Sequence, residues 1–141
     1  MNDEERDAFL ADCRTCRIGT VDGNGTPHVS ALWFVWDGTA LWLNSVVKSQ
    51  RWTNFMRNPK VSVLVDDGRD FMELRGVEII GSVVPVGEVP RRGEPNAELD
   101  GPESAFGRKY ANGEFGYDGG HAWLRLVPEK IVSWDFRKMA G

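Results

Sequence analysis

The chain has 141 residues, a formal net charge of −4 from 17 Lys and Arg against 21 Asp and Glu, and 41% apolar residues. This length and composition fit one globular domain over residues 1–141 and argue against global disorder. The mild acidity argues against a nucleic-acid binder, and no apolar run approaches the roughly 20 residues of a membrane-spanning helix. The acidic N-terminus is unlike a signal peptide, so we expect a cytoplasmic protein without membrane or nucleic-acid partners.

A short acidic helix is predicted over residues 3–12, and a C-x-x-C spacing, Cys13 to Cys16, follows it. Such a pair can be a redox dithiol or half of a zinc site. A thioredoxin-like motif would lie between a strand and a helix, whereas here a strand follows, and His28 and His121 are not spaced to complete a zinc site. We therefore favour two semi-buried residues at a helix-to-strand junction.

Apolar runs separated by turn sequences predict a series of antiparallel strands. The predicted strands cover residues 17–21, 29–36, 41–43, 61–65, 71–84, 122–127 and 131–136. The Asp-Gly-Asn-Gly sequence at 22–25 is typical of a tight hairpin turn. Gly76 and Gly81 lie inside the fifth strand and suit bulges or barrel bends. We expect the third strand to end before Asn44, and Pro128 to separate the last two strands.

One helix is predicted between the third and fourth strands. Ser49 is a good N-cap for it, and Pro59 stops it. Trp52, Phe55 and Met56 have the i, i+3, i+4 spacing of a buried stripe.

Residues 85–103 hold four of the seven prolines and few apolar residues, which predicts a long surface connection. The sequence leaves open whether this connection closes over a site. A second short helix is predicted over residues 103–110. Together the elements indicate a mainly β, α+β fold, a small antiparallel barrel with one inserted helix and short flanking helices. Such a barrel closes its own edges or pairs with a second copy.

The best candidate site lies where the third strand leads into the inserted helix, from Asn44 onward. A helix N-terminus presents free N–H groups and the positive end of the helix dipole, so it favours a phosphate. Lys48 and Arg51 bring two cations to this position, and Ser45 and Ser49 add hydroxyl groups. Cations there oppose the dipole, and a bound anion would offset that cost. The alternative is a capped surface helix with two solvated cations.

Several segments resemble, in their order and spacing, the pyridoxamine 5'-phosphate oxidase-like superfamily of FMN-binding split β-barrels. More narrowly, they resemble its actinobacterial flavin and deazaflavin oxidoreductases, many of which use coenzyme F-420. The segments span residues 18–22, 25–29, 32–38, 48–51, 57–62 and 128–134.

The resemblance implies a homodimeric split antiparallel barrel with a flavin-type cofactor, coenzyme F-420 or FMN, in a groove at the dimer interface. The ring edge of the cofactor would meet the backbone of Ser30, Ala31, Leu32 and Trp33. The phosphate would be held by the segment that begins at Asn44 and contains Ser45, Lys48, Ser49 and Arg51. The resemblance and the anion argument therefore point to the same segment.

The chain departs from the family pattern in two places. Many members carry a lysine where this chain has Arg51, and in the oxidases proper an arginine precedes that lysine, where this chain has Gln50. The C-terminal arginine and histidine pattern that binds substrate in those enzymes is not evident either. We therefore do not expect oxidation of pyridoxamine phosphate itself.

The function expected from the resemblance is hydride transfer between the cofactor ring and a small conjugated or cyclic organic substrate, with F-420 favoured over FMN. No residue is assigned to catalysis. One alternative is a non-catalytic haem- or flavin-binding protein in which His28 or His121 ligates iron. Another is a structural homodimer that has lost its cofactor. Trp33 and Trp134 are the expected walls of the cofactor groove.

Overall fold

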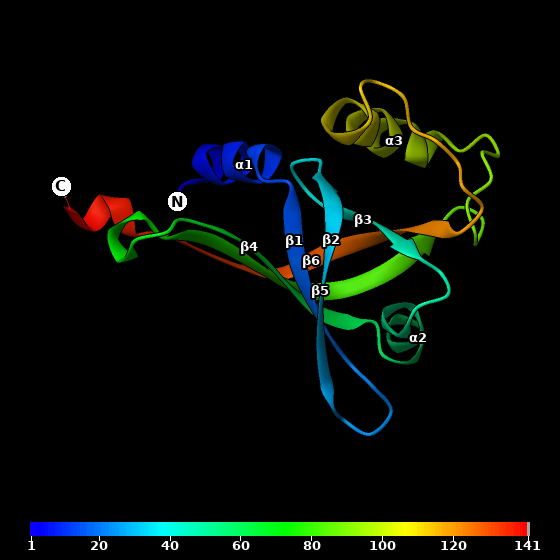
Figure 1. Cartoon of the computed structure of the whole chain (residues 1–141), viewed down its shortest axis with the longest axis horizontal. Helices are drawn as coiled ribbons and strands as arrows, with labels where there is room; N and C mark the ends of the chain where they lie inside the picture. The colour runs from blue at the N-terminus through cyan, green and yellow to red at the C-terminus, as the bar shows by residue number, and fades with distance from the viewer. Residues whose placement is uncertain (141) are drawn as a thin grey trace.

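Six strands form one closed antiparallel barrel in the computed structural model, which describes residues 1–140 (Figure 1). The strand order around the barrel is β1-β2-β3-β6-β5-β4. The elements in chain order are α1 (Asp3–Asp12), β1 (Thr15–Val21), β2 (Pro27–Trp36), β3 (Leu41–Val46), α2 (Gln50–Arg57), β4 (Lys60–Asp67), the 3-10 helix η1 (Phe71–Glu73), β5 (Arg75–Val86), α3 (Ala97–Tyr110), β6 (His121–Asp135) and the 3-10 helix η2 (Phe136–Ala140). The mainly β, α+β barrel with flanking helices that the sequence predicts is confirmed.

The barrel encloses the main hydrophobic core. Its strands alternate inward and outward side chains, and the inward ones are almost fully buried. Among the largest are Ile18, Phe34, Leu43, Ile79 and Leu124. Burying a side chain of this kind contributes about 1.5–3 kcal/mol.

A smaller second core lies between the outer face of the barrel and α3. It contains Trp42 and Trp123 from neighbouring strands and Leu99 and Phe106 from the helix. The outer face of β2, β3 and β6 is apolar at this point, and α3 packs on it.

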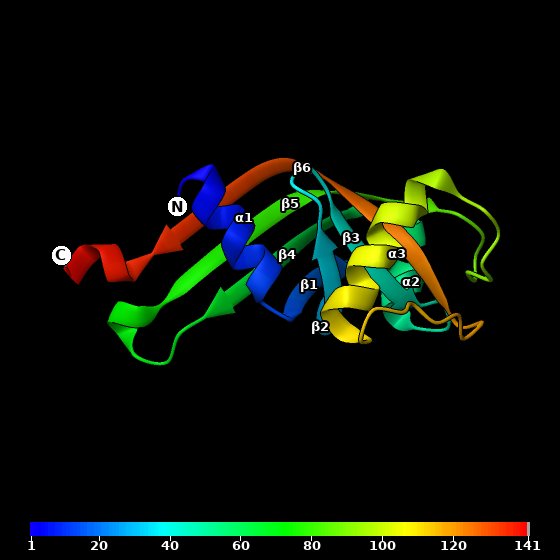
Figure 2. The same cartoon turned by 90° about the horizontal axis from the view of Figure 1, so that it is seen from above.

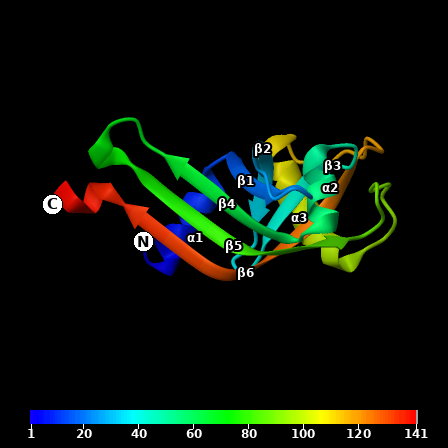
Figure 3. The same ribbon diagram turned by 90° about the horizontal axis from the view of Figure 1, so that it is seen from below.

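Two helices close the ends of the barrel. Phe9 and Leu10 of α1 join the barrel core, and so do Trp52 and Phe55 of α2. Viewed from below, α2 lies at the end of the molecule away from both termini (Figure 3). Met56, which the helical spacing places on the buried stripe, is half exposed instead. It lies at the edge of the stripe, where the barrel no longer covers the helix.

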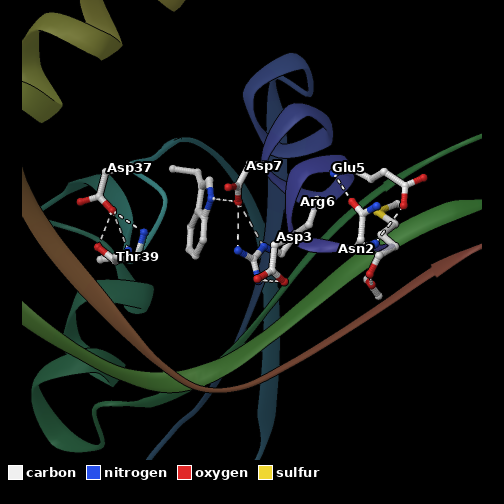
Figure 4. A network of polar contacts seen from close by, with 11 residues as sticks. Asn2, Asp3, Glu5, Arg6, Asp7, Asp37 and Thr39 are labelled. Carbon is white, nitrogen blue, oxygen red and sulfur yellow. Dashed lines mark hydrogen bonds and ion pairs between the residues drawn. The ribbon is translucent and has the colours of Figure 1, made fainter.

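Capping and polar contacts fix α1, the helix that the sequence predicts over residues 3–12 (Figure 4). The Asn2 side chain accepts a hydrogen bond from the Glu5 backbone N–H, and the Glu5 carboxylate accepts one from the Asn2 N–H. Asp7 Oδ1 accepts hydrogen bonds from Arg6 and, at 2.8 Å, from the indole N–H of Trp36. These contacts connect the helix to β2.

Strands β4, β5 and β6 continue beyond the barrel as a three-stranded projection (Figures 1 and 2). The helix α1 crosses it, and η1 and η2 pack together at its tip with the rings of Phe71 and Phe136 5.1 Å apart. The N- and C-termini lie near each other at this end. Among residues 1–140, no helix combines the length and apolarity that crossing a membrane would require.

Three predicted strand boundaries are wrong. β3 runs on through Asn44 to Val46, because this segment pairs with β6. Residues 71–73 form η1 rather than strand, and β5 begins at Arg75. The last two predicted strands are one strand, β6, because Pro128 lies opposite Gly81 where the register shifts. An irregularity of this kind accommodates a residue without a backbone N–H.

The predicted surface connection over residues 85–103 is also partly wrong. The helix α3 begins at Ala97, with Asn96 as its N-cap, and Pro102 lies inside it. Arg91, in the middle of the segment, is 4% exposed and bonds both carboxylate oxygens of Glu103. The buried ion pair therefore joins the start of this segment to α3, and the bonds from Arg91 N to the His121 carbonyl and from the Trp123 indole N–H to Glu103 connect both to β6.

Candidate functional site

The barrel is split between β2 and β3. β2 pairs with β1 from Pro27 to Trp33, but it pairs with β3 only from Phe34 to Trp36. Below Phe34 the two strands diverge, so among the described residues the edge of β2 that faces β3 has no strand partner over residues 31–33. An unpaired strand edge offers backbone N–H and C=O groups to a ligand.

A hollow of about 320 Å³ occupies this split. It is lined by residues of three strands, β2, β3 and β6, and of two helices, α2 and α3: Ala31, Leu32, Trp33, Asn44, Val46, Arg51, Phe106 and His121. The combination of an apolar wall with a few converging polar groups is typical of a small-molecule site.

Arg51 supplies the positive charge of the hollow. Its Nε donates to the hydroxyl of Ser45 and its Nη1 to the hydroxyl of Ser30, both at 3.0 Å. Burial lowers the pKa of Arg51, because removing the guanidinium from water disfavours its charged form. No carboxylate pairs with it in the part of the chain that the structure describes. A half-buried cation with remaining donors and no counter-ion is suited to an anionic ligand.

Asn44 presents a second group without a partner. Its Oδ1 atom is buried and has no hydrogen-bond donor in residues 1–140. Buried polar atoms in native proteins are almost always paired, and leaving one unpaired costs about 1–3 kcal/mol. Since Asn44 lines the hollow, a ligand that donates a hydrogen bond there would satisfy it.

Aromatic rings form the rigid wall of the hollow. The ring of Trp33 stacks on that of Tyr110, with centroids 4.3 Å apart and planes 6° from parallel, and Phe106 lies beside both. The Tyr110 hydroxyl donates to the backbone carbonyl of Arg14 at 2.6 Å. Trp33 remains 45% exposed, so part of its surface is available to a planar ligand.

His121 completes the lining from the start of β6. Its Nδ1 lies 2.5 Å from Oδ2 of Asp118. The other oxygen of Asp118 accepts hydrogen bonds from the backbone N–H groups of Gly120 and His121, at 2.8 and 3.1 Å. These bonds lower the pKa of Asp118 and keep it ionised. The imidazole is thus held in place by a fixed carboxylate.

The structure brings most of the predicted site residues together. Five of them line the hollow: Ala31, Leu32, Trp33, Asn44 and Arg51. Ser30 and Ser45 lie behind it and hold Arg51. Ser49 acts as the predicted N-cap, where its hydroxyl accepts from Trp52 N and donates to Val46 O. Lys48 is exposed and does not line the hollow.

The two tryptophans expected to wall one groove lie apart within the chain. Trp33 lines the hollow, whereas Trp134 lies at the far end of β6, where its ring covers Gly76. Of the six tryptophans, Trp42, Trp52 and Trp123 are core residues.

Three lining residues were not predicted as cofactor ligands. Val46 was missed because the strand was expected to end before Asn44, and Phe106 because its helix gives no sign of which strands it covers. His121 was considered only as a metal ligand, for zinc or for haem iron. His121 lies in the hollow because it pairs with Val46 across β3 and β6. No local sequence signal predicts that register.

A wider hollow of about 590 Å³ lies between the β1–β2 hairpin and α2. It is a less convincing site despite its volume, because its lining residues, Asp22, Gly23, Asn24, His28, Gln50 and Arg57, supply no apolar wall. His28 Nε2 lies 2.9 Å from Asp22 Oδ2, and Asp22 Oδ1 also accepts from the Asn24 and Thr26 N–H groups. His28 is therefore not brought to the split of the barrel.

The cysteines form no reactive centre in the described residues. Cys16 is buried, Cys13 is half-buried and both are free thiols. Burial raises the pKa of both, that of Cys16 to about 12, so neither is a thiolate near neutral pH. No group of three or more His, Cys, Asp or Glu that could hold a metal occurs within residues 1–140.

The family model for pyridoxamine 5'-phosphate oxidase matches residues 2–135, which is nearly the whole chain. The chain belongs to the pyridoxamine 5'-phosphate oxidase family. In this family member the hollow occupies the split between β2 and β3. No curated protein matches the chain by sequence.

Solved structures similar to this family member carry several descriptions. A conserved hypothetical protein of Mycobacterium tuberculosis, Rv2991, is 29% identical over all of this chain and 89% of its own, with a TM-score of 0.82. A protein described as an F-420 reductase is 26% identical over 89% of this chain and 94% of its own, with a TM-score of 0.63. HutZ of Vibrio cholerae, described as a haem storage protein, shares the fold at 18% identity, with 92% of each chain covered and a TM-score of 0.73. The fold thus serves both reductases and haem-binding proteins.

Proposed function

We propose that the chain is an oxidoreductase that binds a flavin-type cofactor, coenzyme F-420 or FMN, in the hollow between β2 and β3. The observation that carries this proposal is the half-buried guanidinium of Arg51, which has two serine hydroxyls as hydrogen-bond partners and no carboxylate among residues 1–140. A phosphate group would neutralise the guanidinium and accept hydrogen bonds from its remaining N–H groups.

The other groups of the hollow suit the rest of such a cofactor. The unpaired edge of β2 over residues 31–33 offers backbone groups to the polar edge of a flavin-type ring. The exposed part of Trp33 offers a stacking surface, and the buried Oδ1 of Asn44 would accept a hydrogen bond. When bound, a flavin or deazaflavin supplies the hydride chemistry, so the protein has to orient it and exclude water.

We further propose that a second copy of the chain completes the groove. The hollow of one chain opens at its surface, and the outward side chains of β2 beside it, Val29 and Trp33, are 74% and 45% exposed. Covering such apolar side chains is the usual role of a homodimer interface. The substrate would be a small conjugated or cyclic molecule; residues 85–103, held by Arg91, would border its entry.

Of the two cofactors we propose F-420, following the resemblance to the actinobacterial oxidoreductases. The F-420 reductase is among the similar structures above 25% identity, whereas a protein described as FAD-binding, from Mesorhizobium loti, is 18% identical. Oxidation of pyridoxamine phosphate is not proposed, since Gln50 occupies the position of the arginine in the oxidases proper.

Substitutions of three cations test the assignment of the phosphate to Arg51. We expect Arg51→Gln to weaken F-420 or FMN binding at least about tenfold, since a hydrogen bond to a charged group contributes about 1.5–3 kcal/mol. Lys48→Gln should have a smaller effect, because Lys48 is exposed outside the lining. Arg57→Gln, at the other end of the same helix, is the matched control and should bind like wild type. Fluorescence titration of each purified variant measures the affinities.

Two further results complete this test. Arg51→Lys keeps the charge and should bind with intermediate affinity, which separates loss of charge from loss of the fold. Arg51→Gln that melts like wild type and still binds with unchanged affinity would show that the phosphate lies elsewhere.

Haem binding is the second candidate, and His121 is the observation that favours it. Of the two histidines that could ligate iron, only His121 lines the hollow. The absorbance spectrum of the protein with haem added separates the two candidates, because axial ligation by histidine gives a Soret band that His121→Ala would shift. An unperturbed free-haem spectrum would reject this candidate.

A further inference from the structure

A pocket of about 280 Å³ lies between the helices α1 and α3, over the last residues of β2. The two helices lie on the same face of the barrel, one on either side of this strand (Figure 2). This α1–α3 pocket shares no lining residue with the hollow between β2 and β3. Its lining consists of Ala11, Val35, Trp36, Ala105, Arg108 and Lys109. The walls are therefore mainly apolar, and the two charged side chains are both cations.

The lining carries two positive charges and no carboxylate. By contrast, the cavities beside the β1–β2 hairpin, between α1 and the three-stranded projection, and beside η1 each include at least one Asp or Glu. Neither Lys109 nor Arg108 forms an ion pair within residues 1–140. Asp12 and Arg14 act on Lys109 at longer range and in opposite senses, so together they add no net counter-charge.

The ammonium group of Lys109 has room for one more partner. Its Nζ donates to the carbonyls of Leu10 and Phe34 at 3.3 and 3.4 Å, which is long for hydrogen bonds of this kind. An ammonium has three N–H donors, so one is left. The side chain is half-buried and has exchanged water for no anion, which lowers its pKa. A carboxylate at Nζ would accept the third hydrogen bond and balance the charge.

The apolar walls are held in place by the fold itself. Val35 is buried and belongs to the second core beneath α3. The indole N–H of Trp36 donates to Asp7 Oδ1 at 2.8 Å, which fixes the ring against α1. Arg108 is exposed at the rim, where it can meet an entering anion. A fixed apolar wall loses little conformational entropy when a ligand covers it.

We propose that the α1–α3 pocket binds a small carboxylic acid with a compact apolar body, such as a substituted benzoate. The carboxylate lies between Lys109 and Arg108, and the apolar body lies against Val35 and Trp36. A volume of about 280 Å³ is at the small end of ligand sites, so it suits one ring or a short branched chain rather than a nucleotide. This site goes beyond the proposed function, because it requires neither the cofactor nor any residue of the hollow between β2 and β3.

Fluorine-19 NMR of the full-length protein with 4-fluorobenzoate as the probe tests the proposal. We expect a dissociation constant in the millimolar range, as is usual for a ligand of about ten non-hydrogen atoms. Lys109→Met should weaken binding at least about tenfold, since it removes a charged hydrogen-bond donor. Lys130→Met, which removes an exposed lysine of β6, is the matched control and should bind like wild type.

Two further variants and a second probe separate the loss of the charge from a loss of the fold. Arg108→Gln changes an exposed side chain and should weaken binding by about two- to fivefold. Lys109→Arg keeps the charge and should bind more tightly than Lys109→Met. The uncharged analogue 4-fluorobenzyl alcohol should bind wild type at least about tenfold more weakly than 4-fluorobenzoate does.

Backbone amide signals locate the bound probe. On titration with 4-fluorobenzoate, the signals of Ala11 and Ala105 should shift, and that of Ala31 in the hollow between β2 and β3 should not. A wild type that does not bind the probe at about 10 mM, or that binds it no more tightly than Lys109→Met does, would overturn the proposal. A shift at Ala31 that disappears in Arg51→Gln would also overturn it, because the carboxylate would then lie at Arg51.

Discussion

Two side chains of the hollow, Arg51 and Asn44, lack the partners that their burial requires. Arg51 is half-buried without a carboxylate in residues 1–140, and the Oδ1 atom of Asn44 is buried without a donor. Both arrangements cost free energy in the protein alone, and one anionic ligand with a donor group would relieve both. The sequence could predict Arg51 from its place at a helix start. It could not predict the burial of Asn44, because that depends on β3 continuing past the expected end.

Lys109 is a second half-buried cation, and its titration reports how far its charge is removed from water. Its Nζ lies 4.0 Å from the centroid of the Phe34 ring and, among residues 1–140, donates to the carbonyls of Leu10 and Phe34, at 3.3 and 3.4 Å. Burial lowers the pKa of Lys109 from 10.5 to about 8. Between these two values the unfolded chain binds more protons than the folded one, so this lysine makes stability rise with pH.

We expect Lys109→Met to remove that rise. The free energy of unfolding of wild type, relative to the variant, should increase between about pH 8 and 10.5 and be flat below pH 8. Urea denaturation at a series of pH values measures it, and groups that titrate in both proteins cancel in the difference. A difference that stays constant across the range would show that the amine is solvated in the folded state.

Whole elements show why local sequence signals set some boundaries and miss others. The capped helix α2 and the hairpin turn after β1 depend on neighbouring residues, and both are predicted correctly. The continuity of β6 through Pro128 depends on the irregularity in β5 at Gly81, which lies far away in the sequence. Similarly, the composition of residues 97–102 did not predict that α3 begins at Ala97. The segment before the helix is fixed by the buried ion pair of Arg91 and Glu103, which are not neighbours in the sequence.

The ion pair of Arg91 and Glu103 anchors the segment between β5 and α3. The carboxylate of Glu103 accepts hydrogen bonds from Arg91, from the Trp123 indole N–H at 3.0 Å and from the Tyr117 hydroxyl at 2.9 Å. Both members of the pair are buried. Arg91 Nη1 also donates to Glu88 Oε1 at 2.6 Å, so removing Glu103 leaves the guanidinium with one carboxylate. Removing Arg91 instead leaves the buried carboxylate of Glu103 without a counter-charge, which costs about 3–5 kcal/mol.

Accordingly, Arg91→Met should lower the free energy of unfolding by about 3–5 kcal/mol, and Glu103→Gln should lower it less, since Glu88 still pairs with Arg91. The double substitution Arg91→Met, Glu103→Gln should lose much less than the sum of the two single substitutions, since the buried position 103 then carries no charge. Chemical denaturation of the four proteins gives the coupling free energy. Additive losses would mean that water reaches the pair and that the segment is not anchored through it.

At the scale of the whole molecule, the site depends on the split of the barrel, where β2 pairs with β3 only from Phe34 to Trp36. The strand signals and the resemblance together predict a split antiparallel barrel, and the closed strand order and the family match confirm it. The position of the hollow could be predicted only in part. Residues of β2 and α2 that line it lie in the resembling segments. Phe106 and His121 lie outside those segments and reach the hollow because α3 packs on the barrel and β6 pairs with β3.

The central claim is that the hollow binds a flavin-type cofactor through its phosphate at Arg51. Comparing FMN with riboflavin, which carries the same ring without the phosphate, tests it most directly. In parallel fluorescence titrations of the wild-type protein, the account predicts that FMN binds at least about tenfold more tightly than riboflavin, and that Arg51→Gln abolishes the difference. Equal affinities for FMN and riboflavin, or binding of neither FMN nor F-420, would contradict it.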